Sequence, residues 1–198
     1  MESVGIIILA AGSSSRYGDI KQLSFYEGRT FVRHAVSISK IVTDKIMVVL
    51  GANAEKVKKE IEDTHVNIVL NENWEEGIAS SIRIGLSAFL EAEPSAKAVI
   101  FLVCDQPFVS TSLLNELISK FLKTNKKIIA STYQGTVGTP ALFEKTFFPD
   151  LLDLQGQSGA KKIIEQNHDE TITVSFPLGY FDIDTKEDYE LLQKQLNK

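Results

Sequence analysis

Short apolar runs alternate with amphipathic stretches along this 198-residue chain up to Tyr133. The first run, Ile6–Leu9, contains no polar residue, which is typical of a strand buried on both faces of a parallel sheet. Further apolar runs predict strands at Ile46–Leu50, Val66–Leu70, Val99–Val103 and Lys127–Thr132.

Segments with apolar residues at helical spacing lie between these runs, and polar residues that suit an N-cap precede two of them. We therefore expect helices over Arg29–Ile41, from Asn53 past Ile61, from Ile78 to about Ala92, and from Ser110 or Thr111 past Phe121. This alternation predicts an α/β fold with a doubly wound, mostly parallel sheet and right-handed crossovers.

The alternation becomes irregular after Tyr133. Gly135, Gly138 and Pro140 predict a loop, and residues 147–157 show no clear period. The remaining expected elements are a short helix near Gly159–Gln166, strands at Thr171–Phe176 and Tyr180–Ile183, and a closing helix from Lys186. Because no Pro-, Gly- or Ser-rich linker divides the chain, we predict a single domain over residues 1–198.

Charge and composition narrow the possible partners. The formal net charge is −5 and no basic stripe outweighs the acidic residues, which argues against a nucleic-acid partner. No apolar run approaches the ~18 residues that a membrane-spanning helix needs. The single cysteine, Cys104, cannot form an internal disulfide. We therefore expect a cytoplasmic protein that binds neither nucleic acid nor a membrane.

The side chains become small directly after the first predicted strand, from Ala10 through Gly12 to Ser15. Small residues at the carboxyl end of a strand leave backbone N–H groups open to an anion. Arg16 and Lys21 follow, and neutral donors beside two cations suit a polyphosphate. The glycine spacing fits neither a Walker A loop nor the dinucleotide-binding fingerprint, and similar turns without a ligand are common in α/β proteins.

Asp105 follows the fourth predicted strand, and ligands of open α/β sheets lie at the carboxyl ends of the strands. We expect it to share a pocket with the loop and to hold Mg²⁺, which takes one or two carboxylates together with phosphate oxygens. The second carboxylate is expected from Asp182 or Asp184, which an extended strand would place on the same face. Asp184 is favoured because it lies at the strand-to-helix junction, and a helix cap is its alternative role.

The first segment also matches the L-A-A-G-x-S-x-R-x-G-x-x-K-x-L motif of nucleotidyltransferases. The matching residues are Leu9, Ala10, Ala11, Gly12, Ser14, Arg16, Gly18, Lys21 and Leu23. The motif most resembles that of the MobA/MocA-like branch, which handles molybdopterin. This resemblance implies a Rossmann-like fold of the nucleotide-diphospho-sugar transferase type and an NTP substrate. With the residue chemistry, it implies catalytic roles for Arg16, Lys21 and Asp105 and metal contacts from Asp105 and Asp184.

A second segment resembles the family's N-x-x-W-x-x-G-x-x-S-S-I, which lies against the nucleobase, and residues 1–110 would form the nucleotide-binding part. The nucleotide-binding residues expected from both segments are Leu9, Ala10, Ala11, Gly12, Ser13, Ser14, Gly77, Ser80 and Ser81. Trp74 of this segment has the shape to stack on a base, but we expect it to anchor the loop.

A third segment resembles the family's G-x-x-G-x-P-x-x-F, which borders the acceptor, and residues 130–185 would form this part. The expected acceptor-binding residues are Gly138, Pro140, Gln157, Lys161 and Asp182. Gln157 and Lys161 stand where relatives have an aspartate and an arginine. Because lysine does not replace arginine at a bidentate site, this departure concerns the identity of the acceptor more than the chemistry.

The sequence thus predicts a Mg²⁺-dependent nucleotidyltransferase that moves a nucleoside monophosphate from CTP or GTP to a phosphate-bearing acceptor. The resemblance implies molybdopterin as that acceptor. The nearest alternative acceptor is a sugar phosphate or polyol phosphate. A non-catalytic nucleotide-binding module that partners a molybdoenzyme is the alternative of another class, and the glycine spacing disfavours a nicotinamide dehydrogenase.

Overall fold

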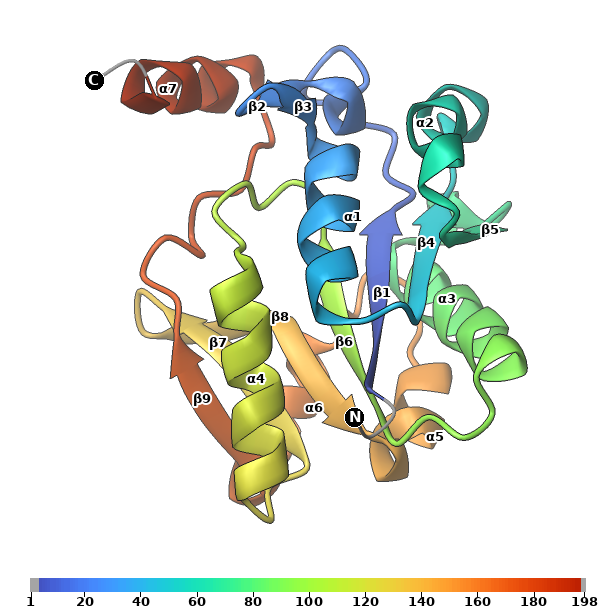
Figure 1. Cartoon of the computed structure of the whole chain (residues 1–198), viewed down its shortest axis with the longest axis vertical. Helices are drawn as coiled ribbons and strands as arrows, with labels where there is room; N and C mark the ends of the chain where they lie inside the picture. Colours follow the sequence, from blue (N-terminus) through green and yellow to red (C-terminus); the bar gives the residue numbers. More distant parts are fainter. Residues whose placement is uncertain (1–3, 197–198) are drawn as a thin grey trace.

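The computed structural model describes residues 4–196. Within them, one sheet has the strand order β5-β4-β1-β6-β8-β7-β9, and β2 pairs with β3 in a separate hairpin (Figure 1). The strands are β1 Val4–Ala10, β2 Phe25–Tyr26, β3 Arg29–Thr30, β4 Ile46–Leu50, β5 Asn67–Leu70, β6 Ala98–Val103, β7 Ile128–Tyr133, β8 Thr136–Glu144 and β9 Thr171–Ser175.

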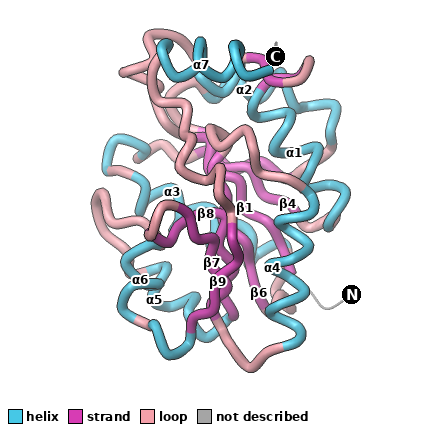
Figure 2. The backbone as a smooth tube through the Cα atoms, turned by 90° about the vertical axis from the view of Figure 1, so that its left-hand side faces the viewer, coloured by secondary structure: helices cyan, strands magenta, loops and turns pink. Residues whose placement is uncertain are grey.

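Helices cover both faces of the large sheet, with α1, α2 and α4 on one face and α3, α5 and α6 on the other (Figure 2). The α-helices are α1 Phe31–Val42, α2 Ala54–Ile61, α3 Ile78–Ala92, α4 Thr111–Lys123, α5 Phe148–Leu152, α6 Lys161–Gln166 and α7 Lys186–Leu196. Short 3-10 helices are η1 Lys21–Leu23, η2 Glu62–Thr64, η3 Trp74–Glu76, η4 Lys145–Phe147 and η5 His168–Glu170. The predicted doubly wound, mostly parallel sheet is confirmed. No helix among residues 4–196 has the length and apolarity needed to cross a membrane.

Strand β1 lies in the interior of the sheet, parallel to β4 on one side and to β6 on the other. Ile6 and Ile8 pack into the core beneath α1, α2 and α4, whereas Ile7 and Leu9 pack into the core beneath α3. Because helices cover both faces, every residue of this strand is buried, and the sequence there has no polar alternation.

The predicted loop around Gly138 is wrong, because residues 136–144 form β8, which is antiparallel to both β6 and β7. Gln134 and Gly135, with φ of 47° and 75°, form the two-residue turn that leads into it. The register with β7 shifts so that Ala130 pairs with Ala141 but Ser131 pairs with Gly138. The two residues between, Thr139 and Pro140, therefore form a bulge, which is where a sheet tolerates proline. A glycine and a proline that predict a loop instead mark an irregular strand.

The predicted strand at Tyr180–Ile183 is also wrong, because this segment is a loop. Ile183 is fully buried in a cluster with Tyr17, Tyr26 and Phe31, so it anchors the loop rather than a sheet. The loop leads into α7, which begins at Lys186 as predicted. Helix α5 lies in the stretch where no period predicted an element.

Candidate active site

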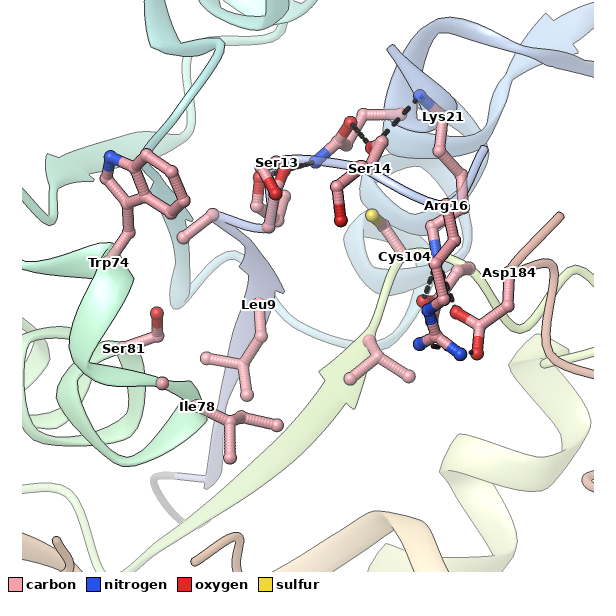
Figure 3. Close-up of a pocket in the computed structure, with 18 of the residues that line it drawn as sticks. Leu9, Ser13, Ser14, Arg16, Lys21, Trp74, Ile78, Ser81, Cys104 and Asp184 are labelled. Atoms are coloured by element: carbon pink, nitrogen blue, oxygen red, sulfur yellow. Dashed lines mark hydrogen bonds and ion pairs between the residues drawn. The ribbon is translucent and has the colours of Figure 1, made fainter. Parts of the chain in front are cut away.

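The loop after β1 lines a cleft of about 500 Å³ at the carboxyl ends of β1 and β6 (Figure 3). The lining residues are Leu9, Ala10, Ala11, Gly12, Ser13, Ser14, Ser15, Arg16, Lys21, Gln22, Trp74, Glu75, Gly77, Ile78, Ser81, Val103, Cys104, Asp105, Gln157 and Asp184. The cleft therefore brings together the predicted phosphate loop, both predicted cations and both predicted metal ligands.

Lys21 lies between the two carboxylates. Its Nζ is 2.7 Å from Asp105 Oδ2 and 3.1 Å from Asp184 Oδ1, and its side chain is only 12% exposed. Arg16 Nη2 lies 2.9 Å from the other oxygen of Asp184, and its side chain is 73% exposed (Figure 3). Although burial of the ammonium acts against its charge, the two carboxylates raise the pKa of Lys21 above its ordinary value. Two cations and two carboxylates thus form one neutral network that opens to water at Arg16.

The backbone brings Asp105 and Asp184 together from segments far apart in the chain. Asp105 follows β6, and the N–H of Ile183 donates a hydrogen bond of 3.0 Å to the Asp105 carbonyl. Thr185 Oγ1 accepts from the N–H of Asp188 at 3.2 Å, and the Asp188 carboxylate accepts from the N–H of Thr185 at 2.8 Å. This reciprocal cap at the start of α7 leaves the side chain of Asp184 free for the cleft.

The two carboxylates fit a divalent cation. Among residues 4–196, no group of three or more His, Cys, Asp or Glu side chains could hold a metal ion. Asp105 and Asp184 can supply two carboxylate oxygens, however, and Mg²⁺ needs no more when phosphate oxygens and waters complete its shell. The ammonium of Lys21, bound by both carboxylates, shows that a cation fits between them.

Asp182 does not line the cleft, and without a strand at this position it does not share a face with Asp184. Partial removal of its carboxyl from water, together with repulsion by Asp105, raises the pKa of Asp182 to about 6, while a hydrogen bond with the Gln106 side chain lowers it. The residue as a whole remains exposed. Asp182 is therefore a carboxyl group beside the site, and its acceptor contact stays a prediction.

Asn71, directly after β5, organises the opposite end of the cleft. Its amide nitrogen donates to Ser80 Oγ at 2.9 Å and to Ser81 Oγ at 3.0 Å, and its side-chain oxygen accepts from the N–H of Asn73 at 3.0 Å. Ser80 is 1% exposed and its hydroxyl reaches the carbonyls of Asn73 and Gly77, so it faces the protein. Ser81 lines the cleft. A nucleotide contact by Gly77, Ser80 or Ser81 stays a prediction, and Ser81 is the best placed.

Two of the predicted acceptor residues lie in different places. Gln157 lines the cleft, and its side chain packs closely against Gly77. A Cβ added at Gly77 would lie 2.8 Å from the side-chain amide of Gln157. Lys161 does not line the cleft, because its Nζ donates to Thr136 Oγ1 of β8 at 2.7 Å. Of the two residues that depart from the family pattern, only Gln157 therefore lines the cleft.

Gly138 and Pro140 lie in β8, outside the residues that line the cleft. A Cβ at Gly138 would be 2.2 Å from the hydroxyl of Tyr133. The space that we expected this glycine to offer an acceptor is therefore taken by the phenol of Tyr133. The carbonyl of Pro140 accepts a hydrogen bond of 2.7 Å from Ser131 Oγ, which stabilises the bulge.

Cys104 lines the cleft beside Asp105 but is only 6% exposed. Burial, and then the charge of Asp105, raises the pKa of Cys104 to about 12. The thiol therefore stays protonated and unreactive near neutral pH. Neither His34, His65 nor His168 lines the cleft.

Three buried carboxamides support the site through hydrogen bonds that the sequence patterns do not predict. Gln22, Asn71 and Gln106 are 2%, 0% and 4% exposed. Gln106 donates to the carbonyl of Gly179 at 3.0 Å and accepts from Thr139 Oγ1 at 3.3 Å, which ties the residue after Asp105 to β8 and to the loop before Asp184. Each carboxamide directly follows a predicted site residue or a strand end. That position is the signal that could have revealed them, since a buried amide needs partners.

Residues 6–171 match the family model of the MobA-like NTP transferase domain. A nicotine blue oxidoreductase from Paenarthrobacter nicotinovorans is 33% identical over 114 residues, which cover 57% of this chain and 54% of that protein. A probable molybdenum cofactor guanylyltransferase from Flavobacterium johnsoniae is 24% identical over 75% of this chain and 73% of that protein. The bifunctional protein GlmU of Buchnera aphidicola is 23% identical over 73% of this chain, which spans only 31% of GlmU.

Solved structures share the fold over nearly the whole chain. The crystal structure of Rv0371c from Mycobacterium tuberculosis has a TM-score of 0.85 and 27% identity and covers 98% of each chain. A complex of Rv0371c with manganese has a TM-score of 0.78 and 24% identity over 97% of this chain and 98% of that one. A 4-diphosphocytidyl-2C-methyl-D-erythritol synthase from Anaerococcus prevotii, with a TM-score of 0.77 and 19% identity over 100% of this chain and 97% of that one, shares the fold alone.

Proposed function

The chain belongs to the MobA-like NTP transferase domain family, and on that premise we propose that it transfers a nucleoside monophosphate from CTP or GTP to the phosphate of molybdopterin, with release of pyrophosphate. The observation that carries this proposal is the convergence of the glycine-serine loop, Lys21 and Arg16 with Asp105 and Asp184 in one cleft. The choice of molybdopterin is supported by the family and by the Flavobacterium relative.

In the proposed reaction, an oxygen of the acceptor phosphate attacks the α-phosphorus of the NTP, and the bond from that phosphorus to pyrophosphate breaks. A phosphate monoester is largely ionised near pH 7, because its second pKa is about 6, so the chain need not supply a general base. The obstacle is electrostatic, since two unit charges 4 Å apart repel by about 4 kcal/mol at an effective dielectric constant near 20.

The residues of the cleft answer this obstacle with positive charge and backbone donors. The loop after β1 and the cations Arg16 and Lys21 bind the β- and γ-phosphates and stabilise the pyrophosphate as it leaves. Asp105 and Asp184 would hold Mg²⁺, which supplies positive charge to the α-phosphate when it is bound. A solved neighbour of the same fold contains manganese, which is in keeping with a divalent cation here.

In the structure Lys21 and Arg16 are bound to Asp105 and Asp184. Phosphates in the cleft would compete with these carboxylates for the same two cations. We propose that Lys21 and Arg16 exchange carboxylate oxygens for phosphate oxygens when the nucleotide binds, which leaves the carboxylates for the metal ion. It follows that the nucleotide and the metal ion strengthen each other's binding.

The proposal is tested by measuring pyrophosphate release from CTP, GTP, ATP and UTP with molybdopterin, each with and without Mg²⁺. We expect release only with CTP or GTP, and only when both molybdopterin and Mg²⁺ are present. Asp153 is an exposed aspartate outside the cleft, and Asp153→Asn provides a control that should keep full activity. If NTP raises the melting temperature of the protein but no pyrophosphate is released in the presence of molybdopterin, the molybdopterin proposal is wrong.

A sugar-phosphate or polyol-phosphate acceptor is the second candidate. It is favoured by the neutral Gln157 in the cleft and by the position of Lys161, which binds Thr136 rather than the cleft. Replacing molybdopterin by a panel of sugar phosphates and polyol phosphates in the same assay distinguishes the two candidates. If no acceptor supports the release of pyrophosphate from the NTP, the result would favour a nucleotide-binding module that partners a molybdoenzyme.

A further inference from the structure

Gln22 lies at the base of the cleft, and each polar atom of its side chain is hydrogen-bonded to the segment Ala10–Ser14. Its side chain is 2% exposed in η1. Nε2 donates to the carbonyl of Ala10 at 3.1 Å and to the carbonyl of Gly12 at 2.7 Å, and Oε1 accepts from Ser14 Oγ at 3.0 Å. One buried amide thus binds the last residue of β1 and two residues of the loop that follows it.

The hydrogen bonds from Gln22 also set the direction of two backbone N–H groups in the loop. A trans peptide unit is planar, and its carbonyl and the following N–H point in opposite directions. Because the carbonyls of Ala10 and Gly12 are held toward Gln22, the N–H groups of Ala11 and Ser13 point away from it. Those residues line the cleft. Fixing two carbonyls therefore also fixes the direction of two donors.

Ser14 extends this connection to Lys21. Its backbone is left-handed, with φ of 57°, and its Oγ accepts from the N–H of Lys21 at 3.2 Å while donating to Gln22. The carbonyl of Ser14 accepts from the N–H groups of Tyr17 and Gly18. The loop and the backbone of Lys21 therefore form one hydrogen-bonded unit, as the positions of Ser13, Ser14 and Lys21 in Figure 3 illustrate.

We propose that Gln22 is a positioning residue that aims the backbone N–H groups of Ala11 and Ser13 at the phosphates of the nucleotide. This inference rests on the proposed function. Only a primary amide of this length provides two donors for the carbonyls and one acceptor for Ser14. A glutamate would place a carboxylate against two carbonyl oxygens, and a methionine of similar shape would leave both carbonyls without a donor.

The test compares Gln22→Met with the unaltered protein by calorimetric titration of GTP, CTP and inorganic tripolyphosphate, each with Mg²⁺. Hydrogen bonds to a charged group are strong enough that misdirecting them should weaken binding about 10- to 100-fold. Because the loop contacts phosphates rather than the base, the same factor is expected for all three ligands. In turnover, KM for the NTP should rise while KM for the acceptor stays unchanged.

Ser131→Ala is a matched control, because it also removes a buried hydrogen bond to a carbonyl, at 2.7 Å from Pro140, outside the cleft. It should lower the melting temperature without changing any of the three dissociation constants. If Gln22→Met does not fold, Ser14→Ala provides a milder change, because it removes the hydrogen bond from Ser14 to Gln22. It should weaken the binding of all three ligands by about threefold or more, which corresponds to the loss of one neutral hydrogen bond.

The outcomes separate the inference from its premise. If the unaltered protein binds none of the three ligands, the proposed function fails. If it binds them and Gln22→Met binds them equally well, the function stands and the positioning role is wrong. A loss for GTP and CTP without a loss for tripolyphosphate would also overturn it, because the effect would then lie at the base.

Discussion

The half of the sheet formed by β5, β4, β1 and β6 differs from the half formed by β8, β7 and β9 in how it delivers residues to the cleft. In the first half every pair of neighbouring strands is parallel, so the segments after β1 and β6 end at the same edge. The second half contains the antiparallel β8, a bulge and a long loop before α7. Parallel strands thus position the loop after β1 and Asp105, whereas the irregular segments position Asp184 and carry Gly138 and Pro140.

The largest expected effect contrasts one aspartate from each region. Asp105→Asn should lower kcat by about 100- to 1000-fold, because it removes a preorganised charge from the reaction centre. Asp182→Asn, outside the cleft, should raise the acceptor KM and leave kcat within about tenfold. Steady-state kinetics with both substrates varied measures this. Equal losses of kcat in the two variants would mean that the halves do not divide the work in this way.

The next largest effect is expected at Lys21, where one substitution should change the affinities for NTP and for the metal ion in opposite directions. Lys21→Met should weaken NTP binding but strengthen the binding of Mn²⁺ alone by about tenfold, because the ammonium no longer competes for Asp105 and Asp184. Electron paramagnetic resonance titration of free Mn²⁺ measures this. Lys127→Met removes a similar ion pair in the other half, to Glu170 at 3.2 Å, and should change neither affinity. Unchanged or weaker Mn²⁺ binding in Lys21→Met would contradict the proposed exchange of partners.

A third prediction tests the packing of the acceptor half. Gly138→Ala should destabilise the protein by about 1–3 kcal/mol, because the new methyl group would lie 2.2 Å from the Tyr133 hydroxyl. The acceptor KM should change and the NTP dissociation constant should not. Adding Tyr133→Phe removes that hydroxyl and should restore part of the stability, since the next ring atom lies 3.1 Å away. Urea denaturation of the unaltered protein and the two variants would falsify this account if the double variant were no more stable than Gly138→Ala.

The smallest expected effect is a pH dependence in the nucleotide half. Burial lowers the pKa of His34 below its ordinary value, although its contact with the Val109 carbonyl acts in the opposite direction. Below about pH 6.5 the unfolded chain therefore binds a proton that the folded chain does not. The free energy of unfolding should fall with decreasing pH by at most about 1.4 kcal/mol per pH unit from this group. His34→Gln should remove that part of the slope when urea denaturation is compared between pH 7 and 5.

Local patterns of the sequence were sufficient for the first half. The apolar runs predicted β1, β4 and β6, because a strand buried on both faces has no polar position. The run at residues 66–70 also predicted β5, which lies at the edge of the sheet and is only partly buried. Small residues after one strand and an aspartate after another predicted a shared cleft, since parallel strands that lie side by side end at one edge. Neither inference needed knowledge of contacts between distant residues.

The second half depended on contacts that no local pattern records. β8 forms despite Gly138 and Pro140, because a bulge against β7 accommodates them. Asp184 rather than Asp182 reaches the cleft, because the buried side chain of Ile183 and its hydrogen bond to the Asp105 carbonyl set the course of the loop. The positions of Gln22 and Asn71 after a site residue and a strand end are visible in the sequence, but their hydrogen-bond partners are not.

The sequence by itself therefore determined the parallel core, the phosphate loop and the charges that the site uses. Only the tertiary structure decided which carboxylate joins Lys21, what fills the space beside Gly138, and which buried amides hold the loops. The physical reason is that periodicity and motifs report the surroundings of one segment. Hydrogen bonds and packing between distant segments depend on the complete fold.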